Sequence, residues 1–147
     1  MEAISICRIL LVEDCPGDVG LVREALRVHR VQCDLRVIDN GEAVVSFIDD
    51  LDQNSKLRCP DLMLLDLGLP RLAGMEVLRY LRASERCGQT PVVIISASNA
   101  PSDYAEALKN AALHYFRKPA SAPQFLLLGK VVKELLSQHR AACPSKL

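Results

Sequence analysis

Short apolar runs alternate along the chain with segments in which hydrophobic residues recur at helical spacing. The runs are nearly continuous rather than alternately hydrophobic and polar, which is typical of strands buried on both faces of a sheet. The runs predict strands at residues 8–12, 35–38, 61–66, 91–96 and 113–117. Helical spacing predicts helices over residues 16–29, 41–50, 72–86, 102–110 and 122–139. Strands that alternate with helices favour an α/β domain: a single doubly wound, five-stranded parallel sheet with five helices.

The length and composition of the chain fit one such domain. The sequence has 147 residues, of which 50% are hydrophobic and 24% charged, so it can bury a core without a metal or a disulfide. We assign the domain to residues 7–139 and expect short tails at residues 1–6 and 140–147. We expect no output domain, so a signal would have to leave through contact with another chain.

Charge and cysteine content narrow the classes of function. Eighteen basic residues balance eighteen acidic ones, so the broad positive field of a nucleic-acid-binding protein is missing and we expect no such partner. No apolar stretch approaches the ~18 residues of a membrane span, and the N-terminus does not resemble a signal peptide. The six cysteines lack the spacing of metal ligands. These features predict a cytoplasmic protein with reduced thiols and no membrane association.

Polar side chains follow four of the five predicted strands. Glu13 and Asp14 follow the first strand and Asp66 ends the third, whereas Ser96 ends the fourth and Lys118 follows the fifth. Ligands of open α/β sheets bind beyond the carboxyl ends of the strands, so we expect these side chains to converge on one edge. Three adjacent carboxylates repel one another unless a cation compensates, and oxygen ligands without His or Cys favour Mg²⁺. Asp66 is then placed as a nucleophile for phosphoryl transfer, with Mg²⁺ and Lys118 neutralising the transferred group.

Four short motifs carry a resemblance to a known family. They are LVED at residues 11–14, LLDLGLP at 64–70, ISA at 95–97 and KP at 118–119. Over residues 7–138 the chain resembles the response-regulator receiver domains of two-component signalling, which implies a flavodoxin-like sheet with strand order 2-1-3-4-5. Residues 13–18 and the polar insert before Cys59 are most similar to the stand-alone receivers that partner bacterial phytochrome histidine kinases.

The resemblance implies a phosphoacceptor and a metal site. Asp66 would accept a phosphoryl group from a phosphohistidine of a sensor histidine kinase. The narrower resemblance implies that this kinase is a bacterial phytochrome. Asp14, Asp66 and the backbone carbonyl of Gly68 would bind Mg²⁺, and Glu13 would act through water.

The resemblance also implies a conformational switch. Ser96 would bond a phosphoryl oxygen, and Lys118 would pair with the phosphoryl group. Tyr115 stands where the family has its switch aromatic, which would swing inward when Ser96 moves. Pro119 would follow a cis peptide bond, an isomer that is accessible mainly before proline.

Two classes of function remain open. The first is a phosphoaccepting signalling receiver that is not an enzyme beyond self-catalysed phosphoryl transfer and dephosphorylation. The second is a phosphorylation-independent interaction or dimerisation module with a receiver fold. The first is favoured by four residues that occur together: Asp14, Asp66, Ser96 and Lys118. A hydrolase with Asp66 as its nucleophile is less favoured because no DxD motif follows the strand.

The last predicted helix carries more apolar positions than one core-facing stripe needs. These positions are Phe125, Leu126, Leu127, Leu128, Val131, Val132, Leu135 and Leu136. One interpretation is a broad core face with Leu126 or Leu127 on its margin. The other is a homodimer interface through this helix, since large exposed apolar patches mark contacts.

Overall fold

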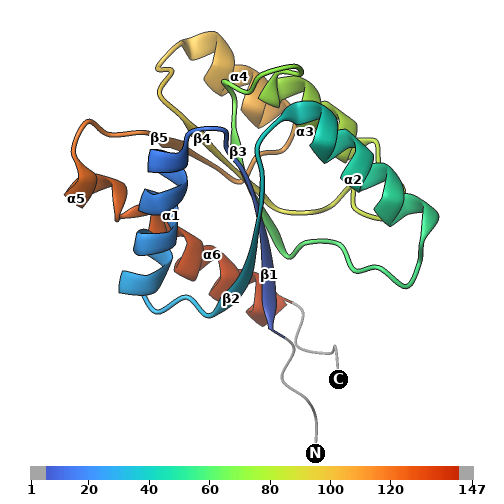
Figure 1. Cartoon of the computed structure of the whole chain (residues 1–147), viewed down its shortest axis with the longest axis horizontal. Helices are drawn as coiled ribbons and strands as arrows, with labels where there is room; N and C mark the ends of the chain where they lie inside the picture. The colour runs from blue at the N-terminus through green and yellow to red at the C-terminus, as the bar shows by residue number, and fades with distance from the viewer. Residues whose placement is uncertain (1–5, 143–147) are drawn as a thin grey trace, which may run out of the picture.

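Five strands form one parallel sheet in the order β2-β1-β3-β4-β5 (Figure 1). The computed structural model describes residues 6–142. The strands are β1 (Cys7–Val12), β2 (Cys33–Ile38), β3 (Leu62–Asp66), β4 (Val92–Ser96) and β5 (His114–Arg117). The predicted fold class and the implied strand order 2-1-3-4-5 are confirmed.

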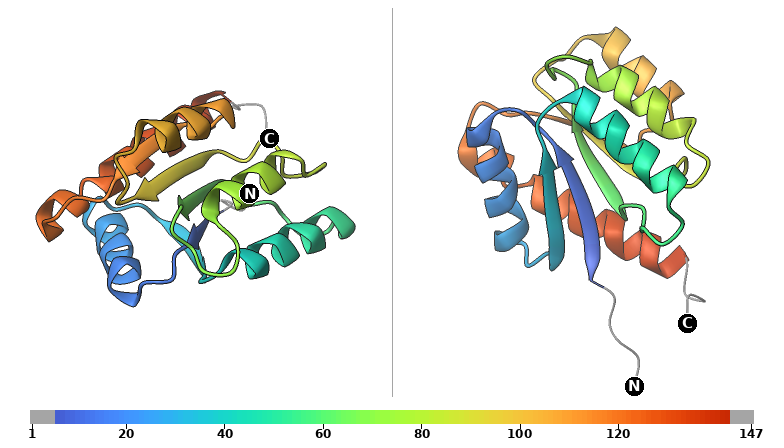
Figure 2. Two further views of the ribbon diagram at one scale, coloured as in Figure 1. Left: turned by 90° about the horizontal axis from the view of Figure 1, so that it is seen from above. Right: turned by 45° about the vertical axis from the view of Figure 1, so that its right-hand side comes forward.

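Helices cover both faces of the sheet (Figure 2). They are α1 (Pro16–Val28), α2 (Gly41–Gln53), α3 (Gly74–Arg82), α4 (Pro101–Lys109), α5 (Ala122–Phe125) and α6 (Leu128–Ala142). The core beneath α2, α3 and α4 is separate from the core beneath α1, α5 and α6. Within residues 6–142, no helix combines the length and apolarity needed to cross a membrane.

The two central strands explain why the apolar runs are continuous. Every residue of β3 and β4 is buried, because successive side chains enter opposite cores: Met63 and Leu65 face one, whereas Leu62 and Leu64 face the other. The edge strands β2 and β5 bury their side chains less completely. The parallel register then brings the carboxyl ends of all five strands to the same edge of the sheet.

The helix boundaries differ from the prediction at the last helix. The sequence predicts one helix over residues 122–139, but the structure contains the short α5 and then α6, which runs to Ala142. Between them the backbone tightens: the amides of Leu127 and Gly129 donate to carbonyls three residues earlier, as in a 3₁₀ turn. Of the eight apolar positions in this region, only Leu127 is largely exposed, at 54%. Most of the set therefore packs into the core.

The third helix is also shorter than predicted. It spans Gly74–Arg82 instead of residues 72–86, because residues 84–90 form a turn that connects it to β4. Gly74 begins the helix against the end of β3, where an added Cβ would lie 2.2 Å from the carbonyl oxygen of Asp66. Only glycine permits this approach, which holds the first turn of α3 next to the site.

The prediction of reduced thiols is wrong for two cysteines. Cys59, in the loop before β3, and Cys87, in the turn before β4, form a disulfide with a Cα–Cα distance of 5.6 Å. β3 and β4 are neighbours in the sheet, so the segments that precede them meet at its amino edge. The two residues lie 28 positions apart without a spacing motif, so only the tertiary fold brings them together.

Gly129 marks a close contact between α6 and α1. An added Cβ would lie 2.1 Å from the carbonyl oxygen of Ala25, a backbone atom that cannot rotate away. We expect Gly129→Ala to lower the free energy of unfolding by about 1–3 kcal/mol, the usual cost of overpacking a core. Gly20→Ala is the matched control, because an added Cβ there meets nothing within 4 Å; we expect it to raise stability by about 0.5–1 kcal/mol. Equal effects of the two substitutions in chemical denaturation would contradict the close contact.

Candidate functional site

Three carboxylates lie together at the carboxyl edge of β1 and β3. Glu13 and Asp14 follow β1, Asp66 ends β3, and the pairing of Val12 with Leu65 places these strand ends side by side. One oxygen from each carboxylate lies within 4.8 Å of the others. Glu13 is 2% exposed and Asp66 7%, so their charges are poorly screened by water. The cluster predicted from the sequence therefore exists, and it needs compensating positive charge.

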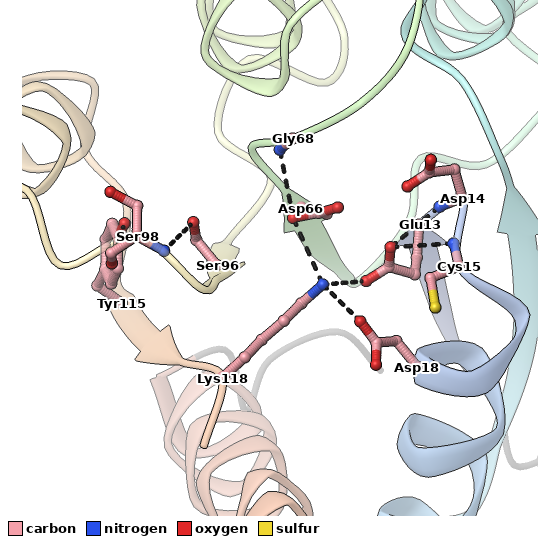
Figure 3. A network of polar contacts seen from close by, with 10 residues as sticks. All are labelled: Glu13, Asp14, Cys15, Asp18, Asp66, Gly68, Ser96, Ser98, Tyr115 and Lys118. Carbon is pink, nitrogen blue, oxygen red and sulfur yellow. Dashed lines mark hydrogen bonds and ion pairs between the residues drawn. The ribbon is translucent and has the colours of Figure 1, made fainter. Parts of the chain in front are cut away.

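Lys118 supplies part of that charge. It follows β5, and its backbone amide donates to the carbonyl oxygen of Ser96 at 2.7 Å. Its ammonium Nζ lies 2.7 Å from Glu13 Oε1, 2.7 Å from Asp18 Oδ2 and 3.6 Å from Asp66 Oδ1 (Figure 3). The side chain is only 15% exposed, so these ion pairs are more than surface contacts. Its nearest partners are thus Glu13 and Asp18 rather than Asp66.

Asp18 is a member of this network that the sequence analysis missed. An acid in the first turn of a helix is explained by the helix dipole alone, so its residue type gave no reason to place it in the site. In the structure its carboxylate accepts a hydrogen bond from Lys118. The available signal was its position in the first turn of α1, the helix that begins two residues after Asp14.

Burial and the charges of the network together shift two pKa values. Burial raises the pKa of the Glu13 carboxyl from 4.5 to about 7; the hydrogen bond from Lys118 opposes this shift, and the charge of Asp66 adds to it. Burial alone would lower the pKa of Lys118, but its hydrogen bonds to Asp18 and Glu13, with the charge of Asp66, raise that pKa above its ordinary value. The ammonium of Lys118 therefore stays protonated at neutral pH. The Glu13 carboxyl, by contrast, gains or loses its proton near neutral pH.

The carboxylate cluster fits a hard divalent cation. All of its side-chain donors are oxygens, and hard cations such as Mg²⁺ prefer oxygen ligands. Asp14 is exposed, which leaves room for the water ligands that Mg²⁺ usually keeps. The backbone of Gly68 lies close by, since its amide donates to Asp66 Oδ1 at 3.3 Å. Glu13, Asp14 and Asp66 are thus the side chains that could hold the ion.

The raised pKa of Glu13 predicts that cation affinity depends on pH. Below about pH 7 the buried carboxyl holds a proton that a bound cation must displace, so Mg²⁺ affinity should rise from pH 5.5 to 7 and level off above it. Isothermal titration calorimetry in buffers of different ionisation enthalpy would measure both the affinity and the protons released. Glu13→Gln should remove most of this pH dependence. An affinity that is constant from pH 5.5 to 7.5 in the unmodified chain would contradict the prediction.

Ser96 lies near Asp66, at the end of the neighbouring strand β4. It is 4% exposed, and its hydroxyl oxygen accepts a hydrogen bond from the amide of Ser98 at 3.1 Å. Together with Asp66, Gly68 and Lys118 it lines a cleft of about 510 Å³ that opens to solvent. The predicted site residues at the ends of β3, β4 and β5 are therefore brought together.

Tyr115 is linked to the same segment. Its hydroxyl donates to the carbonyl oxygen of Ser98 at 3.1 Å, and its ring lies 5.7 Å from that of Tyr104 on α4.

The implied cis bond before Pro119 is wrong: no peptide bond in the described part of the chain is cis. The trans isomer is intrinsically favoured even before proline, by about 0.5–1 kcal/mol.

Comparison with known proteins defines the class of this fold and site. The family model described as "Response regulator receiver domain" matches residues 9–128. The chain therefore belongs to the response-regulator receiver family, and the resemblance stated from the sequence is confirmed. Proteins of this family act in signalling.

Individual relatives narrow the comparison. The chain is 34% identical to response regulator Rcp1 of Synechocystis sp. over 95 residues. These residues make up 65% of this chain and 65% of Rcp1, so the match spans just under two thirds of Rcp1. It is 32% identical over 138 residues to the probable methanogenesis regulatory protein FilR2 of Methanothrix harundinacea, covering 93% of this chain and 88% of FilR2.

Solved structures of cyanobacterial regulators share the fold. The phosphorylated cyanobacterial phytochrome response regulator RcpA superposes with a TM-score of 0.81 at 28% identity, over 90% of this chain and 95% of RcpA. The Mn²⁺-bound form of Rcp1 superposes with a TM-score of 0.77 at 26% identity, over 87% and 92%. This chain is thus similar to the phytochrome response regulator RcpA and to Rcp1, which has been solved with bound Mn²⁺.

Proposed function

We propose that the chain is a single-domain response regulator in which Asp66 accepts a phosphoryl group from a sensor histidine kinase. The observation that carries this proposal is the convergence of a buried carboxylate, a protonated lysine and an acidic cation site on one edge of the sheet. Neither a lone interaction surface nor a structural core requires these charges to be buried together. The similarity to RcpA and Rcp1 supports the same function.

The chemistry is a transfer between two nucleophiles. An oxygen of Asp66 forms a bond to phosphorus while the bond from phosphorus to the kinase imidazole breaks. Lys118 balances the negative charge of the phosphoryl oxygens, and Ser96 donates its hydroxyl to one of them. A Mg²⁺ ion held by Asp14, Asp66 and the Gly68 carbonyl, with Glu13 acting through water, would neutralise further charge. The protein is then a phosphoacceptor and not an enzyme with a separate substrate.

Phosphorylation would change a surface next to the site. Movement of Ser96 toward the phosphoryl group shifts the segment that ends at Ser98, to which the Tyr115 hydroxyl is bonded. Tyr115 then moves inward, and the face formed by α4, β5 and α6 changes shape. Tyr104 and Leu108 of α4 are 51% and 53% exposed on the molecule, so this change would be available to a partner.

Incubation with a small phosphodonor tests the proposal directly. The chain is mixed with acetyl phosphate and Mg²⁺, and its intact mass is measured. We expect the gain of one phosphoryl group, lost on treatment with hydroxylamine because an acyl phosphate is cleaved by it. Omission of Mg²⁺ should slow the reaction strongly. No mass gain under any condition would favour the phosphorylation-independent module instead.

The similarity to RcpA supports a particular kind of kinase partner. We infer a kinase partner of the bacterial phytochrome type, because this chain shares its fold with the phytochrome response regulator RcpA at 28% identity. We also propose a cytoplasmic location, the compartment expected from the sequence. Labelling by a phosphorylated phytochrome kinase at a rate well above that of unrelated histidine kinases would support the pairing.

Self-association is a separate part of the proposal. Leu127, between α5 and α6, is the exposed apolar residue from which a homodimer contact through the last helices could be built. Sedimentation velocity with and without a phosphoryl mimic measures this. A monomer at high concentration in both states would exclude the dimer without affecting the phosphoacceptor role.

A further inference from the structure

We propose that Asp18 is a positioning residue that holds Lys118 away from Asp66 and so limits how readily the unphosphorylated chain takes up a phosphoryl group. This inference rests on the proposed function, in which Lys118 pairs with the phosphoryl group on Asp66. Asp18 belongs to α1, outside the strand ends that supply the other site residues.

The distances show where the ammonium is held. Lys118 Nζ is 2.7 Å from the carboxylate of Asp18 but 3.6 Å from that of Asp66. Figure 3 shows the lysine side chain reaching between the two, with Asp18 on the α1 side and Asp66 above it. Asp18 is 26% exposed and Lys118 15%, so solvent screens their attraction only in part.

Asp18 differs from the other short-range partner of Lys118. Glu13 also accepts hydrogen bonds from the amides of Asp14 and Cys15, and it belongs to the cation cluster. A cation bound there would engage Glu13 and weaken its hold on the lysine. Asp18 lies outside that cluster, and in the described residues its carboxylate has Lys118 as its hydrogen-bond partner. Its attraction for the ammonium therefore persists when a cation is bound.

A phosphoryl group on Asp66 must compete with this attraction. For Lys118 to pair with the phosphoryl oxygens, its ammonium has to leave Asp18 at least in part, and the abandoned carboxylate then faces a second negative group. Both effects favour the unphosphorylated state. Removing the charge of Asp18 should therefore favour the phosphorylated state, while the fold keeps its other contacts.

Beryllium fluoride binding in the presence of Mg²⁺ measures this effect without covalent chemistry. We expect Asp18→Asn to bind beryllium fluoride about three- to tenfold more tightly than the unmodified chain does. This is the range that one partly screened charge produces at short distance, about three- to tenfold in affinity. Asp18→Glu, which keeps the carboxylate, should stay within about twofold of the unmodified chain. Glu24→Gln removes one charge from the same helix without contacting Lys118, since Glu24 pairs with Arg27, and it should also change affinity less than about twofold.

Tighter binding could arise because Lys118 moves or only because one negative charge is removed. Crystal structures of the unmodified chain and of Asp18→Asn, both without beryllium fluoride, distinguish these two explanations. Positioning predicts that Nζ moves within hydrogen-bond distance of Asp66 in the variant. Unchanged or weaker fluoride binding by Asp18→Asn overturns the proposal, and so does tighter binding with the ammonium unmoved. A wild-type chain that neither binds fluoride nor is phosphorylated would instead refute the proposed function, and this inference with it.

Discussion

Asp66→Asn is expected to abolish phosphoryl incorporation from acetyl phosphate and from any histidine kinase. The amide has nearly the shape of the carboxylate but is not a nucleophile, so the bond to phosphorus cannot form. We expect labelling to fall below about one hundredth of the unmodified level, the scale of loss when a covalent nucleophile is removed. Intact mass after a fixed incubation with donor and Mg²⁺ measures it.

The fold should survive this substitution. Asp66 is 7% exposed and contributes to the raised pKa of Glu13, so removing its charge relieves repulsion within the cluster. We therefore expect chemical denaturation of the cation-free variant to show a free energy of unfolding no lower than that of the unmodified chain. The pKa of Glu13 should fall, and Mg²⁺ should bind more weakly.

A matched substitution on another strand makes the result specific. Asp34→Asn on β2 carries the same chemical change on an exposed carboxylate at the edge of the sheet, and it should leave labelling unchanged. Labelling that persists in Asp66→Asn, with the phosphoryl group mapped to the tryptic peptide that contains Asp14, would mean that another residue is the acceptor. Asp14 would then be the first residue to test.

The sheet could be predicted from sequence because its strands have a strong local signal. β3 and β4 are buried at every position, so their sequences are unbroken apolar runs that end in Asp66 and Ser96. Once the strands are parallel, their carboxyl ends must meet, and the site residues at those ends follow without any tertiary information. Strand order came only from family resemblance, because burial does not reveal which strands are neighbours.

The features that were missed depend on contacts between distant segments. The break before α6 accompanies the close approach of Gly129 to Ala25, and nothing in the local pattern of leucines indicates it. The helix dipole alone explains why an acid stands at Asp18. Its contact with Lys118 joins residues that are one hundred positions apart, so no local pattern indicates it. Sequence patterns report the environment of one element, whereas these features arise between two.

Reduction of the Cys59–Cys87 disulfide is the second change for which we expect a large effect. The bond closes a loop of 28 residues, and in the chain-entropy account such a crosslink contributes about 3–4 kcal/mol by restricting the unfolded chain. We expect dithiothreitol to lower the free energy of unfolding by that amount in chemical denaturation. The Cys59→Ser/Cys87→Ala double variant should match the reduced chain and should not respond to dithiothreitol. Cys15→Ser, which removes an exposed thiol outside the bond, should behave as the unmodified chain does.

The reduced chain should remain folded because other contacts hold the same segments. The Arg86 guanidinium donates to the carbonyl oxygens of Asn54 and Leu57, at 3.0 and 2.7 Å. Asp52 accepts hydrogen bonds from the Ser84 hydroxyl at 2.6 Å and from the Arg86 amide at 3.1 Å. The loop before β3 thus stays tied to the turn before β4. An unfolding midpoint that does not change on reduction would show that the bond is not formed in solution.

Stability and signalling should respond differently to this reduction. The disulfide precedes β3 and β4, whereas Asp66 and Ser96 lie at their opposite ends, with a full strand of buried residues between. We therefore expect phosphoryl incorporation to be the same in the oxidised and reduced chains at temperatures where both are folded. Disulfides are rare in a reducing cytoplasm, so a receiver that works there would do so mainly in its less stable dithiol form. Loss of labelling on reduction, with the fold retained, would instead show that the disulfide is coupled to the site at the opposite ends of β3 and β4.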